Sequence, residues 1–189
     1  MKKKIKTALI SVFDKKNLKS LLSILKKNKI KIISSGGTYK EIVRLKFKCL
    51  EVSNFTNSPE ILDGRVKTLH PKIHAGILNK REKKSHLKDL KDNDIENIDL
   101  VIVNFYPFES IIKETRNHKK IIENIDVGGP TMVRSAAKNY NDVTVITSSE
   151  QYEELIQELR KYKGSTSLNF REKLSRMAFA ETAYYDSVI

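Results

Sequence analysis

Short apolar runs alternate with amphipathic helical stretches along most of this chain, and this alternation restricts the fold more than any other feature. The apolar runs at 7–12 (TALISV), 30–34 (IKIIS) and 49–52 (CLEV) each have the length of a buried strand. Between them, residues 15–28 and 38–46 repeat apolar side chains at helical spacing. The order β-α-β-α-β predicts a parallel sheet with right-handed crossovers, so we expect an α/β domain.

The second half of the chain continues this pattern and contains the strongest strand signal. The run IDLVIVNFYPF, at 98–108, predicts a buried strand that Pro107 ends. We expect a further strand at 142–147 and helices at 81–92, 108–125, 131–139, 151–162 and 167–189. The last helix reaches Ile189 without a glycine cap or a polar tail, which favours a domain cut from a longer protein.

Length and composition restrict the class of protein. The 189 residues suit one large domain. The net charge of +13 raises the possibility of nucleic-acid binding, but the lysines are spread along the chain among Asp and Glu, so we favour a solvated surface. The single cysteine, Cys49, excludes an intrachain disulfide and is expected to be a buried thiol rather than a nucleophile. No signal peptide or membrane span is predicted, so we expect a cytoplasmic protein.

Polar residues follow each expected strand, where the active sites of parallel sheets lie. They are Ser11, Asp14 and Lys15, the stretch 34–38, the long polar loop 53–76, Asn104 and Tyr106, and finally Asp126, Gly128, Thr131 and Lys138. Loops as long as 53–76 are usually functional in compact domains. We expect these groups to converge on one rim of the sheet.

The stretch SSGGT, at 34–38, resembles a phosphate cradle. Its glycines let backbone N–H groups approach an anion, its hydroxyls add donors, and the dipole of the following helix favours negative charge. The spacing matches neither the Walker A nor the GxGxxG pattern, so an ordinary strand-to-helix turn with Thr38 as N-cap stays open.

The stretch GRVKTLHPKIHAG, at 64–76, gathers cations and hydroxyls between two glycines, which suits a metal, nucleic acid or a small anion. His70 and His74 are four residues apart, as zinc ligands on a helix can be. However, Pro71 disfavours helical dihedrals at His70, and there is no HExxH pattern. We therefore expect structural or substrate-orienting imidazoles and no metal.

Four residues with acid–base chemistry lie after strands or glycine breaks: Lys67, Tyr106, Asp126 and Lys138. A carboxylate beside two ammonium groups can act as acid and base when it is partly desolvated. Ordinary surface salt bridges are the other reading. No Ser-His-Asp or Cys-His arrangement suggests covalent catalysis.

Five segments together resemble a known family: ISVFDK (10–15), SSGGT (34–38), PEILDGRVKTLHPKIHAGIL (59–78), VNFYPF (103–108) and ENIDVGGPTMVRSAAKN (123–139). They are similar to the N-terminal, inosine monophosphate (IMP) cyclohydrolase domain of bifunctional purine biosynthesis proteins, as is the closing FAETAYYDSVI. The resemblance covers essentially the whole chain, 1–189. It implies a methylglyoxal-synthase-like, Rossmann-like three-layer α/β domain, with a central, mostly parallel sheet flanked by helices.

The resemblance also implies an activity. The family closes the ring of 5-formamidoimidazole-4-carboxamide ribonucleotide (FAICAR) to give IMP and water, the last step of de novo purine biosynthesis, without cofactor or metal. The implied partner is this small ribonucleotide, with no nucleic acid or membrane. A homodimer is possible, and the family normally carries a C-terminal AICAR transformylase domain that is absent from this chain.

Site residues follow from matching motif positions. The phosphate contacts implied by the resemblance are Ser35, Gly36, Gly37 and Thr38, with Ser11, Lys15, Arg65 and Thr68 close by; Asn104 and Gly128 would line the base. The implied catalytic set is Lys67, Tyr106, Asp126 and Lys138.

The expected chemistry assigns one role to each member of this set. Asp126, held by Lys138, takes the proton of the attacking amine, Lys67 stabilises the oxyanion, and Tyr106 donates or relays a proton. One position departs from the family, because Phe13 stands where a serine is usual and removes a hydroxyl.

Other functions remain to be distinguished. Methylglyoxal synthase and the allosteric domain of carbamoyl phosphate synthetase share the fold, but they are not expected to combine RVKTLHP with VGGPTMVRSAAKN. A regulatory module of this kind would bind a nucleotide or phosphate without turnover. A basic nucleic-acid binder is the third reading, and the chain has no recognised motif of that class.

Overall fold

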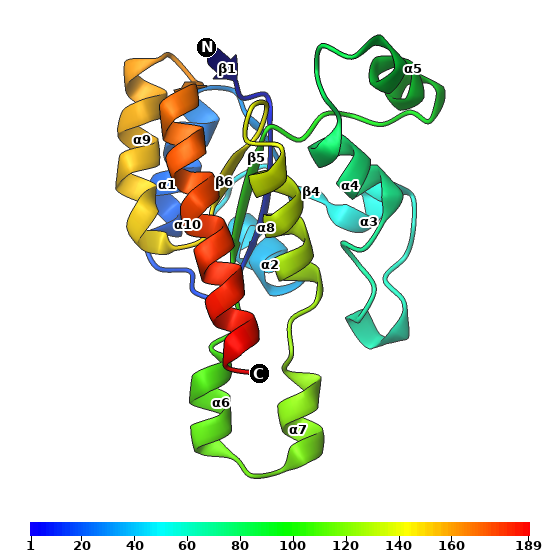
Figure 1. Cartoon of the computed structure of the whole chain (residues 1–189), viewed down its shortest axis with the longest axis vertical. Coiled ribbons are helices and arrows are strands. Elements are labelled where there is room, and N and C mark those ends of the chain that lie inside the picture. The colour runs from blue at the N-terminus through cyan, green and yellow to red at the C-terminus, as the bar shows by residue number, and fades with distance from the viewer.

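The computed structural model describes the whole chain, Met1–Ile189, and is built around a five-stranded parallel sheet (Figure 1). In spatial order its strands are β4 (Leu50–Glu51), β3 (Lys31–Ser34), β2 (Thr7–Val12), β5 (Leu100–Asn104) and β6 (Thr144–Ile146). All four neighbouring pairs are parallel, so the carboxyl ends of the strands lie along one edge.

The connections leave the centre of the sheet in two directions. The chain runs from β2 outward through β3 to β4, and then returns to β5 on the other side of β2 and continues to β6. Open α/β sheets bind ligands at such a reversal, in the crevice beyond the carboxyl ends of the two central strands. The topology therefore directs attention to the ends of β2 and β5.

Helices cover both faces of the sheet. They are α1 (Leu18–Lys27), α2 (Gly36–Arg44), α3 (Val52–Thr56), α4 (Pro71–Leu78), α5 (Lys84–Asp92), α6 (Phe108–Glu114), α7 (His118–Glu123), α8 (Gly128–Lys138), α9 (Tyr152–Lys161) and α10 (Leu168–Ser187). Helix α1 packs with α9, whereas α8 packs with α4 and α10. Right-handed crossovers in opposite directions place α1 and α8 on opposite faces, which gives the expected three layers. No helix is long and apolar enough to cross a membrane.

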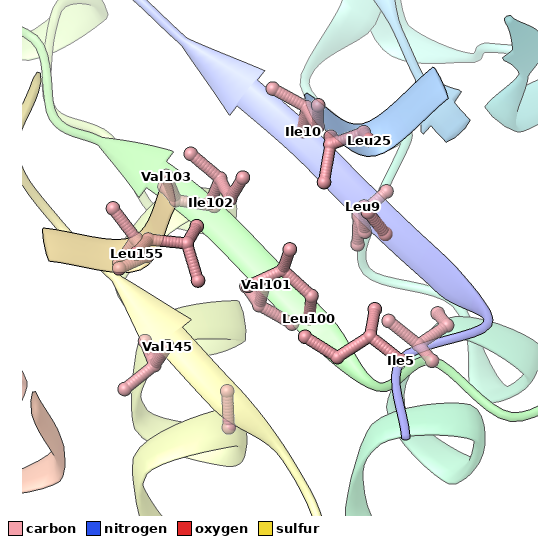
Figure 2. Close-up of a cluster of buried hydrophobic side chains, with 14 of the residues drawn as sticks. Ile5, Leu9, Ile10, Leu25, Leu100, Val101, Ile102, Val103, Val145 and Leu155 are labelled. Atoms are coloured by element: carbon pink, nitrogen blue, oxygen red, sulfur yellow. The ribbon is translucent and has the colours of Figure 1, made fainter. Parts of the chain in front are cut away.

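One continuous hydrophobic core fills the space between the layers. Leu9 and Ile10 of β2 lie beside Leu100–Val103 of β5, and Leu25 of α1 and Leu155 of α9 pack against them (Figure 2). These strands are buried on both faces, which explains why their sequences are continuously apolar rather than alternating.

The strands and helices expected from the sequence are present, but the segment 53–76 differs from the expected loop. It contains α3, a 3₁₀ turn at Leu62–Gly64 and the first six residues of α4. Helix α4 begins at Pro71 because proline suits the first helical position and His70 caps the helix by accepting a hydrogen bond from the N–H of Lys72 (3.1 Å). His70 therefore lies just before α4, whereas His74 lies within it.

Two further differences are the start of α8 and a pair of short strands. Helix α8 begins at Gly128, before Pro130, because the Asp126 carboxylate accepts a hydrogen bond from the N–H of Gly129. A small antiparallel ribbon of β1 (Lys2–Lys4) and β7 (Ser165–Ser167) was not expected, since both segments are polar and lack an alternating pattern.

Arg171 has the largest side chain that the fold buries completely. It donates hydrogen bonds to the carbonyls of Tyr140 (2.8 Å), Asn141 (3.0 Å) and Thr166 (2.5 Å). Burial lowers the pKa of Arg171, and these carbonyls compensate part of the cost. The residue fastens α10 to β7 and to the turn before β6.

Candidate active site

A cleft of about 680 Å³ opens at the carboxyl edge of the sheet, where β2, β3 and β5 end. All but one of the expected site residues line it: Ser11, Lys15, Ser35, Gly36, Gly37, Thr38, Arg65, Lys67, Thr68, Asn104, Tyr106, Asp126 and Gly128. These residues come from five separate segments of the chain. The parallel topology brings them together because each segment follows the carboxyl end of a strand or leads into a helix at that edge.

Lys138 is the exception. It lies at the last position of α8, exposed to solvent, whereas Asp126 precedes the first turn of the same helix. An α-helix of 11 residues is about 16 Å long, so the two side chains lie at opposite ends. The expectation that Lys138 holds Asp126 is not met in this structure, because the continuous helix α8 keeps the two side chains apart along its whole length.

The start of α2 forms the anion-binding end of the cleft. Ser35 is the N-cap, and no side chain caps the N–H groups of the first turn, which point out of the helix. Gly36 has a φ of +54°, a conformation that favours glycine. Free N–H groups and the positive end of the helix dipole suit a phosphate at this position.

Thr38 lines this end of the cleft, but its side chain is engaged with the backbone of β2. It is buried, and its hydroxyl both donates to the carbonyl of Val12 and accepts from the N–H of Val12, at 2.9 Å each. The side chain therefore fastens α2 to the end of β2, and Ser35 rather than Thr38 occupies the N-cap position.

Lys67 reaches the anion-binding end from the opposite wall. Its Nζ lies 3.0 Å from Oε1 of Glu60, a residue that the sequence analysis did not single out. Gly64 makes room for it, because a Cβ there would lie 2.9 Å from Cε, whereas a Cβ at Gly36 would make only an ordinary contact, 3.5 Å from Nζ. Glu60 therefore holds the ammonium group between α2 and the 3₁₀ turn.

Asp126 lines the same cleft, in the turn before α8. Its Oδ1 accepts a hydrogen bond from the N–H of Gly129 (2.8 Å), and its own N–H donates to the hydroxyl of Tyr185 (2.8 Å). Burial raises the pKa of the Asp126 carboxyl, although the Gly129 hydrogen bond opposes this. Tyr185, on α10, was missed because nothing in the sequence relates it to the Asp126 turn.

The segments that carry Lys67 and Asp126 are in close contact. A Cβ at Gly128 would lie 2.8 Å from Oγ1 of Thr68, so the glycine lets the two loops approach. Thr68 is buried at this contact. The catalytic candidates therefore face one shared space rather than two separate sites.

The central wall of the cleft is aromatic. The rings of Phe13 and Tyr106 lie 5.1 Å apart between centroids, tilted by 51°, and both line the cleft. Asn104 was expected to line the base, but its amide is engaged: Oδ1 accepts from the N–H of Phe13 (2.6 Å) and of Asp14 (3.1 Å), and Nδ2 donates to the carbonyl of Asp14 (3.0 Å). Asn104 therefore fixes the turn that presents Phe13.

Arg65 forms an ion pair with Glu123, the last residue of α7, and both side chains line the cleft. The arginine expected to hold a phosphate is thus held by a carboxylate in this structure. The pair is exposed, so the attraction between its charges is weak. Glu123 was missed because its helix is remote from the 64–76 stretch in the sequence.

The other reactive side chains take part in packing. His70 caps α4, and Nδ1 of His74 lies 3.1 Å from the hydroxyl of Ser135 on α8. The structure has no group of three or more side chains placed to hold a metal ion. Cys49 is half-buried rather than fully buried as expected, and this partial burial raises the pKa of its thiol to about 12, so the thiol stays protonated.

Comparison with known proteins agrees with this geometry. Residues 17–131 match the model of the MGS-like domain, and residues 136–189 match that of the AICARFT/IMPCHase bienzyme. The chain is 49% identical over 183 residues to the bifunctional purine biosynthesis protein PurH of Prochlorococcus marinus subsp. pastoris, covering 96% of this chain and 35% of that protein. It is 44% identical over 188 residues to PurH of Rhizobium rhizogenes, again covering 35% of that protein.

Among solved structures, the crystal structure of ForH superposes with a TM-score of 0.85 at 29% identity, covering 97% of this chain and 96% of the other. The chain spans about a third of the length of the curated relatives named above. The methylglyoxal-synthase-like fold expected from the sequence is confirmed, since the matching model covers more than half of the chain. The chain therefore belongs to the family of MGS-like domains.

Proposed function

We propose that this chain is an IMP cyclohydrolase that closes the ring of FAICAR to give IMP and water. The observation that carries the proposal is the arrangement of the cleft, in which a free helix N-terminus for a phosphate shares one space with Lys67, Tyr106 and Asp126. The relatives named PurH support the same activity. We propose that their transformylase activity belongs to the part of their length that this chain does not span.

Ring closure makes one bond and breaks one. The nitrogen of the 4-carboxamide attacks the carbon of the 5-formamido group, so the nucleophile is an amide nitrogen rather than the amine expected from the sequence. The nitrogen loses a proton while the formyl oxygen gains one, which gives a cyclic carbinolamine. This hydroxyl then leaves with a second proton as water, while the former formamido nitrogen loses its proton and forms a C=N double bond to the same carbon.

Three side chains match these steps. Asp126 accepts the proton of the carboxamide nitrogen, and its raised pKa makes the carboxylate a stronger base than an exposed aspartate. Lys67 stabilises the charge that develops on the formyl oxygen. The hydroxyl of Tyr106 donates a hydrogen bond to the departing oxygen or relays a proton to it. Because the reaction is intramolecular, holding the two groups in attack geometry accounts for a large part of the rate.

The phosphate and ribose are held by the remaining polar wall. The N–H groups of Gly36 and Gly37 bind the phosphate, with Ser35 and Lys15 beside them. Arg65 joins this set once it is released from Glu123. A homodimer and a cytoplasmic location stay predictions.

The direct test is to incubate the purified chain with FAICAR and follow IMP by absorbance. Lys67→Ala is expected to lower kcat/KM about 10²- to 10³-fold, because it removes a charge aimed at the developing oxyanion. Lys173→Ala is the matched control, since Lys173 pairs with Glu154 on the surface outside the cleft. Tight binding of IMP without turnover of FAICAR would favour a regulatory module instead.

Lys138→Ala tests whether Lys138 is catalytic, as the resemblance implies, or lies outside the site, as its position in the structure indicates. Its place at the far end of α8 predicts unchanged turnover. A loss as large as that of Lys67→Ala would restore the catalytic role implied by the sequence.

A further inference from the structure

A pair of aromatic rings stands in a cleft that is otherwise mostly polar. Phe13 is 49% exposed and Tyr106 is 47% exposed, and both line the cleft. Large apolar side chains left in water lose the favourable free energy of burial, which a ligand covering them restores. The proposed chemistry gives Tyr106 a task but leaves Phe13 without one.

The position of Phe13 is fixed by hydrogen bonds. Asn104 accepts from its N–H at 2.6 Å, and Nζ of Lys15 donates to its carbonyl at 3.0 Å. The ring rests against Tyr106 at 5.1 Å and 51°, a tilted arrangement that aromatic pairs favour. Since the backbone is held and one side of the ring is supported, little conformational freedom is left to lose when a ligand covers the other side.

The location of the pair suits the base of a nucleotide. The strand order places β2 between β3 and β5, so the phosphate end after β3 and Tyr106 after β5 are two strand spacings apart, roughly 10 Å. Phe13 follows β2, between them. A ribose spans the interval between an anion at Gly36 and a planar ring at the aromatic pair.

We propose that Phe13, supported by Tyr106, forms the subsite on which the planar heterocycle of the ribonucleotide stacks. This inference rests on the proposed function, because it takes the ligand of the cleft to be a ribonucleotide. It gives Phe13 a role in choosing ligands with a flat aromatic base. The hydroxyl that a serine would supply at this position is replaced by a stacking surface.

The test compares two ligands that differ only in the base. Binding of IMP and of ribose 5-phosphate is measured by calorimetry for the wild type and for Phe13→Ala, Phe13→Trp and Phe179→Ala. Base stacking on an aromatic side chain corresponds to an affinity change of about 10- to 100-fold. Phe13→Ala is therefore expected to weaken the binding of IMP by this factor and to leave the binding of ribose 5-phosphate unchanged. Phe13→Trp is expected to keep the affinity for IMP.

Phe179→Ala is the matched control, since Phe179 is 39% exposed on α10 and does not line the cleft. Equal weakening of both ligands by Phe13→Ala, or no weakening of IMP, would overturn the proposal. The two proposals fail in different ways. Turnover of FAICAR with an unaffected Phe13→Ala variant removes only the stacking subsite. Base-dependent binding that is lost in Phe13→Ala, without turnover in the wild type, removes only the cyclohydrolase.

Discussion

Replacing Gly129 with alanine places a methyl group against the proposed catalytic carboxylate. The new Cβ would lie 2.3 Å from Oδ2 of Asp126, below the 3.0 Å that such contacts reach, so the carboxylate must move by about 0.7 Å. Gly37 offers a matched control, because it is likewise the second residue of its helix and a Cβ there meets nothing within 4 Å.

The two substitutions are expected to differ in their effect on stability. Alanine is favoured over glycine in a helix by up to about 1 kcal/mol, and Gly37→Ala is expected to gain this. In Gly129→Ala the displaced carboxylate no longer accepts the N–H at 2.8 Å, and losing such a cap costs about 1 kcal/mol. The variants should therefore differ by about 1 to 2 kcal/mol in free energy of unfolding, or roughly 2 to 8 °C in melting temperature.

Activity should respond more strongly than stability. A misplacement of about 1 Å can cost about 10²-fold in rate, so kcat/KM of Gly129→Ala for FAICAR is expected to fall by about this factor. Thermal denaturation and the absorbance assay measure the two quantities on the same samples. If Gly129→Ala melts with Gly37→Ala and turns over FAICAR at the wild-type rate, the role given to the Asp126 turn is wrong.

Four further outcomes follow from the same contacts. Tyr185→Phe keeps the ring packing against Phe105 but leaves the N–H of Asp126 without its partner, which should lower the free energy of unfolding by about 1 to 3 kcal/mol; an unchanged melting temperature would contradict this. Glu123→Gln releases Arg65 and should lower KM for FAICAR slightly with kcat unchanged, whereas a higher KM would mean that the ion pair helps binding. Burial raises the pKa of Asp126 above the ordinary 3.8, so kcat/KM should fall on the acid side at a pH above 3.8. The raised pKa also means that the contribution of Asp126 to stability is full below pH 3.8 and is lost as pH rises through the folded-state pKa. As the pH rises through this pKa, Asp126→Asn should therefore gain stability relative to the wild type. Urea denaturation at several pH values measures this.

The sheet could be predicted from the sequence because its strands are buried on both faces. Residues 8–10 and 100–103 must be apolar to lie between two helical layers, and this requirement is visible in a single sequence. The ribbon of β1 and β7 could not be predicted, because its stability depends on pairing across most of the chain. Buried Arg171 was hidden for a similar reason, since its partners are backbone carbonyls that carry no sequence signal.

The sequence by itself determined the order of strands and helices, the glycine-rich helix start and the residue types available for chemistry. These depend on local dihedral preferences and on which faces must be apolar, both of which act over a few residues. Only the tertiary structure decided which side chains share the cleft. In the structure Lys67 pairs with Glu60, and the N–H of Asp126 donates a hydrogen bond to Tyr185. Thr38 and Asn104 form hydrogen bonds to the backbone of neighbouring segments, and Lys138 lies at the far end of α8. Contacts such as that of Asp126 with Tyr185, which lie 59 residues apart in the chain, depend on distances that the packing of the layers sets.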